Sequence, residues 1–130
     1  RTTQGAHLGA NAILTYNGKL LLEKRRDSDI WGLVGGGCKR QETGREAIAR
    51  EVREEVNIEV ANIRYFGSQP WPYPMGLMVG FQADYVSGDI ALIDGELKEA
   101  AFFTRDNLPP IPGKMSMARM LIDDWMMNAS

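Results

Sequence analysis

Two apolar runs near the start of the chain, separated by a turn signal, predict a β-hairpin. Residues 8–25, LGANAILTYNGKLLLEKR, place β-prone apolar segments on either side of Asn17-Gly18. Asn-Gly is a strong hairpin signal because both residues accept the positive φ angles of a two-residue turn. We therefore expect two antiparallel strands joined at this dipeptide.

The apolar spacing changes to four residues in the next part of the chain, which indicates a helix. Ile48, Val52 and Val56 recur at i, i+4 and i+8, so they share one helical face. Just before them, Thr43-Gly44-Arg45-Glu46 has the spacing of a capping box, in which the hydroxyl and the glutamate satisfy amides that the first turn leaves free. The pattern predicts an amphipathic helix over about 44–56.

The second half of the chain has mainly strand patterns. Residues 58–66 alternate weakly between apolar and polar, residues 77–86 form a clearer strand, and a further strand is expected at about 100–104. Three prolines between residues 70 and 74 are expected to forbid regular structure there, because proline cannot donate a backbone hydrogen bond.

A final helix is expected after Ser116, a plausible N-cap. Its large apolar residues are expected to pack in the core rather than form a binding face: Met117, Met120, Leu121, Ile122 and Trp125. Strands dominate on either side of the central helix, and the chain shows no linker, repeat or low-complexity segment. These patterns predict one domain over residues 1–130, of α/β or α+β class with a mixed sheet.

Composition and charge exclude several classes of protein. The chain has 130 residues, 44% hydrophobic and 25% charged, which suits one folded domain and not a disordered chain. The net charge of -2 provides no overall basic field for long nucleic acid or an anionic membrane. The single cysteine, Cys38, cannot form an internal disulfide, and no apolar run approaches the length of a membrane span. We therefore expect a cytoplasmic protein with no membrane partner.

Acidic residues gather on one face of the central helix. Counting 100° per residue from Val52, we place Glu51, Glu54 and Glu55 within about 100° of arc. Neighbouring carboxylates repel one another unless they are well solvated or bind a cation, and oxygen donors select hard ions such as Mg²⁺ or Mn²⁺. A solvated acidic face is the common alternative for this pattern.

The surroundings of these acids favour the metal site. Gly35, Gly36 and Gly37 lie directly upstream, where missing side chains allow the backbone to approach a ligand closely. Arg50 can pair with Glu54 at i+4 or with Glu46 at i−4 and so hold the acids in place. A glycine loop with free amides, together with a carboxylate-bound metal, is a means for a nearly neutral protein to bind a diphosphate.

The segment that contains these residues resembles the Nudix box. From Gly36 to Ile58 the chain reads GGCKRQETGREAIAREVREEVNI, against G-x5-E-x7-R-E-U-x-E-E-x-G-U with U aliphatic. Eight of the nine specified positions match, and Asn57, which also tolerates a left-handed conformation, stands at the late glycine. The resemblance implies a Nudix hydrolase: an α/β/α sandwich with a mixed sheet that cleaves a nucleoside diphosphate linked to another moiety, with Mg²⁺ or Mn²⁺.

A second, narrower resemblance lies downstream. Residues 68–74, SQPWPYP, are similar to the SQPWPFP motif of the NADH pyrophosphatase branch of the Nudix family, and the likeness spans most of the C-terminal half. On physical grounds alone, a proline-stiffened aromatic segment either stacks a purine or nicotinamide or packs on its own core. One cysteine in the chain excludes the four-cysteine zinc ribbon usual in that branch. Gly37 also stands where the branch has a Phe that helps hold the nicotinamide end.

The resemblance implies roles for individual acidic residues. Glu51 and Glu55 are implied metal ligands, and the Gly35 carbonyl completes the inner sphere. Glu54 is implied as a ligand or a base near the metal, and Glu96 aligns with a downstream acid that also reaches the metal. Either Glu54 or Glu96 would take the proton from the attacking water.

The implied substrate contacts lie downstream of the box. They are Gln69, Trp71, Pro72, Tyr73 and the backbone of Ala118. Four residues are expected to support the site: Gly36, Gly37, Glu42 and Arg50. Of these, Glu42 is expected to hold the geometry between loop and helix, and Arg50 to orient the acids. His7, the only histidine, is expected to take no part in the chemistry.

These features predict metal-dependent hydrolysis of a dinucleotide diphosphate, such as NADH or NAD, to two mononucleotides. The alternative within enzymes is an ADP-ribose or nucleotide-sugar pyrophosphatase, and hydrolysis of a dinucleotide cap on RNA stays open because the chemistry is the same. From another class, a catalytically silent nucleotide-binding module is less favoured, since such modules usually lose box acids. The expected partner is a small-molecule nucleotide, and a homodimer is left open because related enzymes often form one.

Overall fold

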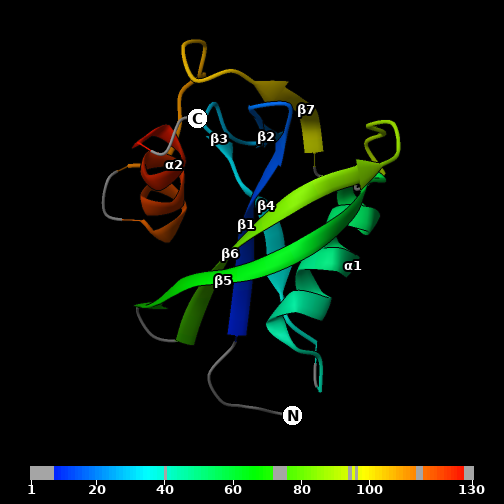
Figure 1. The fold of residues 1–130 in the computed structure, drawn as a ribbon, viewed down its shortest axis with the longest axis vertical. Helices are drawn as coiled ribbons and strands as arrows, with labels where there is room; N and C mark the ends of the chain where they lie inside the picture. The colour runs from blue at the N-terminus through cyan, green and yellow to red at the C-terminus, as the bar shows by residue number, and fades with distance from the viewer. Residues whose placement is uncertain are drawn as a thin grey trace.

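The computed structural model of the chain describes residues 8–39, 41–71, 76–93, 95, 97–113 and 116–127. Within these residues, one mixed sheet of seven strands lies between two helices, which cover its opposite faces (Figure 1). The arrangement is the α/β class with a mixed sheet that the sequence predicts. None of the helices in the described ranges is long and apolar enough to cross a membrane.

The strands pair in an order that differs from their order along the chain. The elements are β1 (Leu8–Tyr16), β2 (Lys19–Arg25), β3 (Trp31–Gly32), β4 (Val34–Gly37), α1 (Gly44–Val56), β5 (Glu59–Trp71), β6 (Gly76–Ser87), β7 (Leu97–Phe103) and α2 (Met117–Met127). The sheet order is β3-β2-β1-β6-β5, with β4 paired to β1 and β7 paired to β2. Strand β1 runs parallel to β6, and the other pairs are antiparallel. Strand β1 therefore lies at the centre of the fold.

The predicted hairpin is confirmed. Asn17 and Gly18 connect β1 to β2 with φ angles of 52° and 74°, and Thr15 pairs with Leu20 across the turn. Both turn residues are in the left-handed region that Asn and Gly tolerate best. The local turn chemistry thus sets the register of the first two strands.

The glycine run is a strand and not the loop that the sequence predicts. Gly35, Gly36 and Gly37 belong to β4 and pair with Asn11, Ala10 and Gly9 of β1. Glycine has little intrinsic preference for strands, so the pairing depends on the partner strand rather than on local propensity. At Gly35, φ is 150°, and a Cβ atom there would overlap the backbone of Ala10 and Asn11. Only glycine permits this close approach.

The proline segment is also partly regular, which corrects the expectation from the sequence. Strand β5 continues through Pro70 to Trp71, and these residues pair with Leu77 and Gly76 of β6. Strand β5 lies at one end of the sheet order, where a proline that lacks an N–H group need not satisfy a second neighbour. The two remaining prolines of the motif, Pro72 and Pro74, lie outside the described residues.

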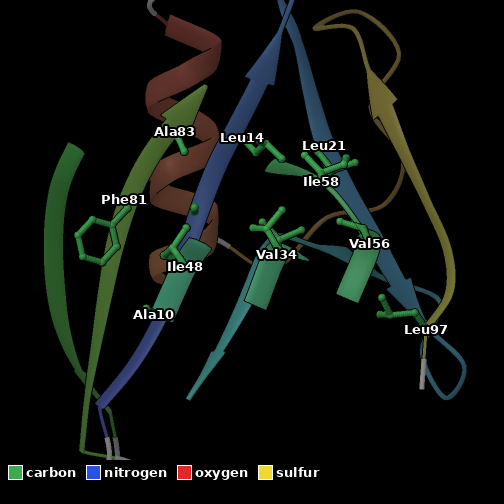
Figure 2. Packing of buried hydrophobic residues seen from close by; sticks show 12 residues of the cluster. Ala10, Leu14, Leu21, Val34, Ile48, Val56, Ile58, Phe81, Ala83 and Leu97 are labelled. Atoms are coloured by element: carbon green, nitrogen blue, oxygen red, sulfur yellow. The ribbon is translucent and has the colours of Figure 1, made fainter. Parts of the chain in front are cut away.

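Helix α1 has the predicted bounds because both of its ends are capped. The Thr43 hydroxyl accepts from the Glu46 amide at 3.1 Å, and the Glu46 carboxylate accepts from the Thr43 amide at 2.9 Å. Asn57 ends the helix in the left-handed conformation, with φ of 66°. Its fully buried Ile48 and Val56 pack with residues of β1, β4 and β6, as Figure 2 shows. This cluster fixes α1 against the sheet.

Helix α2 covers the other face of the sheet. Leu121, Ile122 and Trp125 are buried with Ile13 of β1, as expected from the sequence. The expectation that Met120 packs in the core is wrong, because 45% of this residue is exposed. The buried residues lie along one stripe of the helix, and Met120, which immediately precedes Leu121, is turned away from that stripe.

Candidate active site

Glu51 of α1 lies directly against the backbone of β4. A Cβ atom added at Gly36 would overlap the Oε2 atom of Glu51. The Glu51 side chain is only 18% exposed. The Glu51 carboxylate can therefore lie beside the strand only because Gly36 has no side chain.

Glu55, one turn later, approaches the same strand. Only 5% of this residue is exposed, and its Oε1 atom lies 3.5 Å from the Gly35 amide. A carboxylate is costly to bury, so its place at the interface between helix and strand indicates a specific role. Glu51 and Glu55 thus both face the Gly35–Gly36 backbone.

Glu54 has a different environment from the other two acids. Its side chain is 56% exposed, and its Oε1 atom forms an ion pair with Nη1 of Arg50 at 3.2 Å. In the part of the chain that the structure describes, no three acidic, histidine or cysteine side chains form a group that could hold a metal ion. The structure therefore brings Glu51 and Glu55 to β4 and leaves Glu54 at the surface beside Arg50.

Arg50 connects the helix, the strand and the segment between them. Its Nε and Nη2 atoms donate to the two carboxylate oxygens of Glu42 at 2.7 Å and 2.9 Å, and Nη2 donates to the Gly37 carbonyl at 3.0 Å. Nη1 also lies 3.6 Å from Glu51 Oε2. Of the two helical partners expected from the sequence, Glu54 is bound, whereas Glu46 caps the helix instead.

The charge state of Glu42 follows from these contacts. Hydrogen bonds from the Arg50 guanidinium and from the Lys39 backbone amide lower the pKa of Glu42 to about 2, from an ordinary value of 4.5. The same ion pair raises the pKa of Arg50. Both groups therefore stay charged at neutral pH, and the pair acts as a fixed support for the site.

Cys38 follows β4 and is half-buried. Burial raises the pKa of its thiol, and the nearby Glu42 carboxylate raises it further. Because the thiolate is the nucleophilic form, these surroundings disfavour a catalytic thiol. The backbone of Cys38 donates to the Leu8 carbonyl at 2.8 Å, which extends the pairing of β4 with β1.

The residues implied to contact substrate are only partly described. The backbone of Gln69 and Trp71 belongs to β5, but their side chains lie outside the description, as do Glu96, Pro72 and Tyr73. Ala118 lies in the first turn of α2 and packs against the cluster on that face of the sheet. The expected roles of these six residues remain predictions.

The structure also singles out Asn11, a residue that the sequence analysis does not include among the candidates. Its Oδ1 atom is buried and has no hydrogen-bond partner among the described residues. Asn11 lies on β1 beside Gly35, close to the candidate active site. The one signal in the sequence is a polar residue within the apolar run LGANAIL.

Comparison with known proteins supports the resemblance. A model described as the NUDIX domain matches residues 5–123. The chain is 45% identical to the NAD-capped RNA hydrolase NudC of Pseudomonas aeruginosa (strain LESB58) over 101 residues, which are 78% of this chain and 36% of that protein. It is 44% identical to the protein of the same name from Vibrio vulnificus (strain CMCP6) over 104 residues, 80% of this chain and 40% of that protein.

The fold is found in solved structures as well. A NUDIX hydrolase from Nitrosomonas europaea superposes with a TM-score of 0.83 at 23% identity, covering 97% of this chain and 73% of that chain. At this identity the likeness concerns the fold alone. The chain spans about two fifths of the length of the two NudC relatives.

Proposed function

The chain belongs to the NUDIX family, and on that premise we propose that it hydrolyses the diphosphate linkage of a nucleoside diphosphate derivative. The observation that carries the proposal is the approach of Glu51 and Glu55 to the Gly35–Gly36 backbone, within a nearly complete Nudix box. Such a group of oxygen donors is suited to binding a divalent metal ion and a diphosphate, and not to catalysis by a cysteine thiol or a histidine.

The donors present fit Mg²⁺ or Mn²⁺. Mg²⁺ is commonly held by one or two carboxylates, and waters and substrate phosphates complete its coordination. Glu51 and Glu55, with the Gly35 carbonyl, would supply the protein ligands. A third acid in the same cluster is therefore not needed before the substrate binds. When bound, the ion supplies charge neutralisation on the diphosphate oxygens and lowers the pKa of a bound water.

The remaining residues position the reaction. Arg50 fixes Glu42 and the Gly37 carbonyl and so keeps β4 in place relative to α1. Glu54 is exposed beside Arg50, so its carboxylate can accept a proton from the attacking water. Glu96 is the alternative base, and the choice between the two is tested by separate substitutions.

We propose a dinucleotide such as NADH or NAD as the substrate, with two mononucleotides as products. Support comes from the relatives, which are named NAD-capped RNA hydrolase NudC, a name that links hydrolysis to NAD. The same name favours a second candidate function, removal of an NAD cap from RNA, through cleavage of the same diphosphate. ADP-ribose and nucleotide sugars are the alternative substrates.

A substrate panel tests the proposal. The protein is incubated with Mg²⁺ or Mn²⁺ and NADH, ADP-ribose, a diadenosine polyphosphate, a nucleotide sugar or an NAD-capped RNA oligonucleotide, and products are separated by chromatography. We expect NADH to give two mononucleotides. Wild-type protein that is inert on all five compounds would overturn the enzymatic proposal and favour a silent binding module. Cytoplasmic location and a homodimer remain predictions.

A further inference from the structure

Asn11 is surrounded by glycines across the sheet. It pairs with Gly35 of β4 on one side and with Gly80 of β6 on the other, and Gly80 pairs in turn with Gly67 of β5. The next row on the same face of the sheet, two residues along β1, places Gly9 between Gly37 and Met78. Asn11 is therefore the one side chain in a row of four residues, and a second row beside it contains two more glycines.

The Asn11 side chain points to the face of the sheet opposite α1. Ala10 and Ala12, the residues on either side of it, pack in the cluster that contains α1, whereas Ile13 packs with α2. Because side chains alternate along a strand, Asn11 shares the α2 face with Ile13. Gly36 faces Glu51 on the other side, so β4 separates the candidate metal ligands from Asn11.

The glycine rows are open at two positions, Gly37 and Gly67, whereas Gly80, between Asn11 and Gly67, is buried. Among the described residues, a Cβ atom at Gly37 or at Gly67 would meet no atom within 4 Å, and one at Gly9 would meet the flexible end of Met78 at 3.1 Å. A flat backbone surface beside a polarisable thioether suits a planar ring better than it suits a branched side chain. The chain thus offers a surface for a flat heterocycle one strand away from Glu51.

The Oδ1 atom of Asn11 is the unpaired part of the amide within the described part of the chain. Its Oδ1 atom is buried without a hydrogen bond from the described residues, an arrangement that native proteins avoid unless another group supplies the donor. The residue as a whole is half-buried, and the last torsion of Asn rotates over a broad range. Rotation can therefore bring the oxygen to the open side when a ligand offers an N–H group.

We propose that Asn11 is a specificity residue, whose side-chain oxygen accepts a hydrogen bond from the NH₂ group of a substrate heterocycle lying on the glycine rows. The proposal rests on the proposed function, since the diphosphate would lie at Glu51 and Glu55 while the ring passes to the other face of β4. Both rings of NAD carry an NH₂ group, one on adenine and one on the carboxamide. A ring without this group leaves the Asn11 oxygen unpaired, so it should bind less well.

Analogues of NAD test the proposal and identify the ring. Nicotinic acid adenine dinucleotide lacks the carboxamide NH₂, and nicotinamide hypoxanthine dinucleotide lacks the adenine NH₂. We expect the wild-type kcat/KM to be lower for one analogue than for NAD by roughly 10-fold, the size of one lost hydrogen bond in a site built for it. Asn11→Leu, which keeps a similar volume, should lower kcat/KM for NAD by about the same factor. Its kcat/KM for that analogue should stay within about twofold of the wild-type value.

Controls separate this role from a structural one. Thr15→Val changes the same strand on the same face and should leave all three kcat/KM values unchanged. The melting temperature of ligand-free Asn11→Leu should rise, because the substitution removes an unpaired buried acceptor. Asn11→Ala is measured in parallel in case leucine does not fit. An Asn11→Leu protein that keeps wild-type kcat/KM on NAD, or loses activity equally on all three substrates, overturns the proposal.

Failure of the proposed function can be told apart from failure of this proposal. If the wild-type chain hydrolyses none of the three dinucleotides, binding of AMP and of nicotinamide mononucleotide is measured by calorimetry. About tenfold weaker binding of either nucleotide by Asn11→Leu supports the role of Asn11. Equal binding by the two proteins overturns it.

Discussion

Arg50 and Glu42 form a two-point ion pair, with Nε–Oε2 and Nη2–Oε1 distances of 2.7 Å and 2.9 Å. Glu42 precedes α1 and Arg50 lies in its middle, so the pair closes the segment between β4 and the helix. Arginine suits this position because its planar fork matches both carboxylate oxygens at once. The pair keeps the Gly37 carbonyl and the Glu51 carboxylate at fixed positions on the two sides of the site.

The first prediction concerns this fork. Arg50→Lys keeps the charge but cannot bind both oxygens of Glu42 and the Gly37 carbonyl together. We expect kcat/KM to fall by about 10- to 100-fold, as found for groups that support metal ligands. Steady-state kinetics at saturating Mg²⁺ measures the change. Arg53→Lys is the matched control, since Arg53 pairs with Glu59 at the surface and should change little. Equal losses in both variants would contradict the role of Arg50.

The second prediction is a pH dependence of stability. The pKa of Glu42 is lowered to about 2 in the folded chain, against about 4.5 as the ordinary value. In this interval the unfolded chain binds more protons, so the contribution of Glu42 is complete above about 4.5 and is lost as the pH falls toward 2. Melting temperatures of the wild type and Glu42→Gln should therefore converge between these values. A difference that stays constant from pH 6 to pH 2 would exclude the linkage.

The third prediction compares two neighbouring glycines. Gly36→Ala places a methyl group on the Glu51 carboxylate, whereas Gly37→Ala places one in open space. We expect Gly36→Ala to weaken Mn²⁺ binding by about 10- to 100-fold because it displaces Glu51, a proposed metal ligand. Gly37→Ala should bind Mn²⁺ as the wild type does. Titration calorimetry with Mn²⁺ measures both, and equal affinities for all three proteins would show that Glu51 does not bind the metal.

The fourth prediction concerns metal removal and the acids. Chelation by EDTA should abolish hydrolysis, and added Mg²⁺ or Mn²⁺ should restore it. Glu55→Gln and Glu54→Gln should each lower kcat by more than about 100-fold. Substitution of residues that only support metal ligands already lowers activity by up to about 100-fold. Glu59→Gln, at the exposed end of another ion pair, is the control. Full activity in EDTA would contradict a metal-dependent reaction.

Glu54 and Glu55 should differ in one respect. Glu55 is buried against β4, so Glu55→Gln should weaken Mn²⁺ binding as well as turnover. Glu54 is exposed beside Arg50, so its substitution should affect kcat more than metal affinity if it serves as the base. A pH–rate profile that loses its acidic limb in Glu54→Gln would support that role.

The parts of the fold that could be predicted from the sequence have local causes. Helix α1 has the predicted bounds because its cap and its apolar stripe are determined by residues that are close together in the sequence. Strand β4 could not be predicted, because glycine does not favour a strand and only the partner β1 makes it one. The continuation of β5 through Pro70 depends on its place at the edge of the sheet, which is a property of the topology.

The candidate site shows the same division. Helical geometry predicts that Glu51 and Glu55 lie close together, and the structure places both at β4. The i, i+4 spacing also predicts the pair of Arg50 with Glu54, but not the two-point pair of Arg50 with Glu42, which depends on where Glu42 lies. The sequence marks Asn11 only as a polar residue in an apolar run, and its glycine neighbours, which are distant in the sequence, follow from the register of three strands.

The end of α1 has a consequence for how the Nudix motif is defined. Asn57 adopts a φ of 66° at the position where the motif specifies glycine, and its side-chain amide donates to the Asp89 carbonyl at 3.3 Å. The requirement at this position is a left-handed backbone, and asparagine meets it while adding a bond that glycine cannot form. Searches that demand glycine there would discard chains whose box is otherwise complete, and a pattern that admits asparagine would recover them.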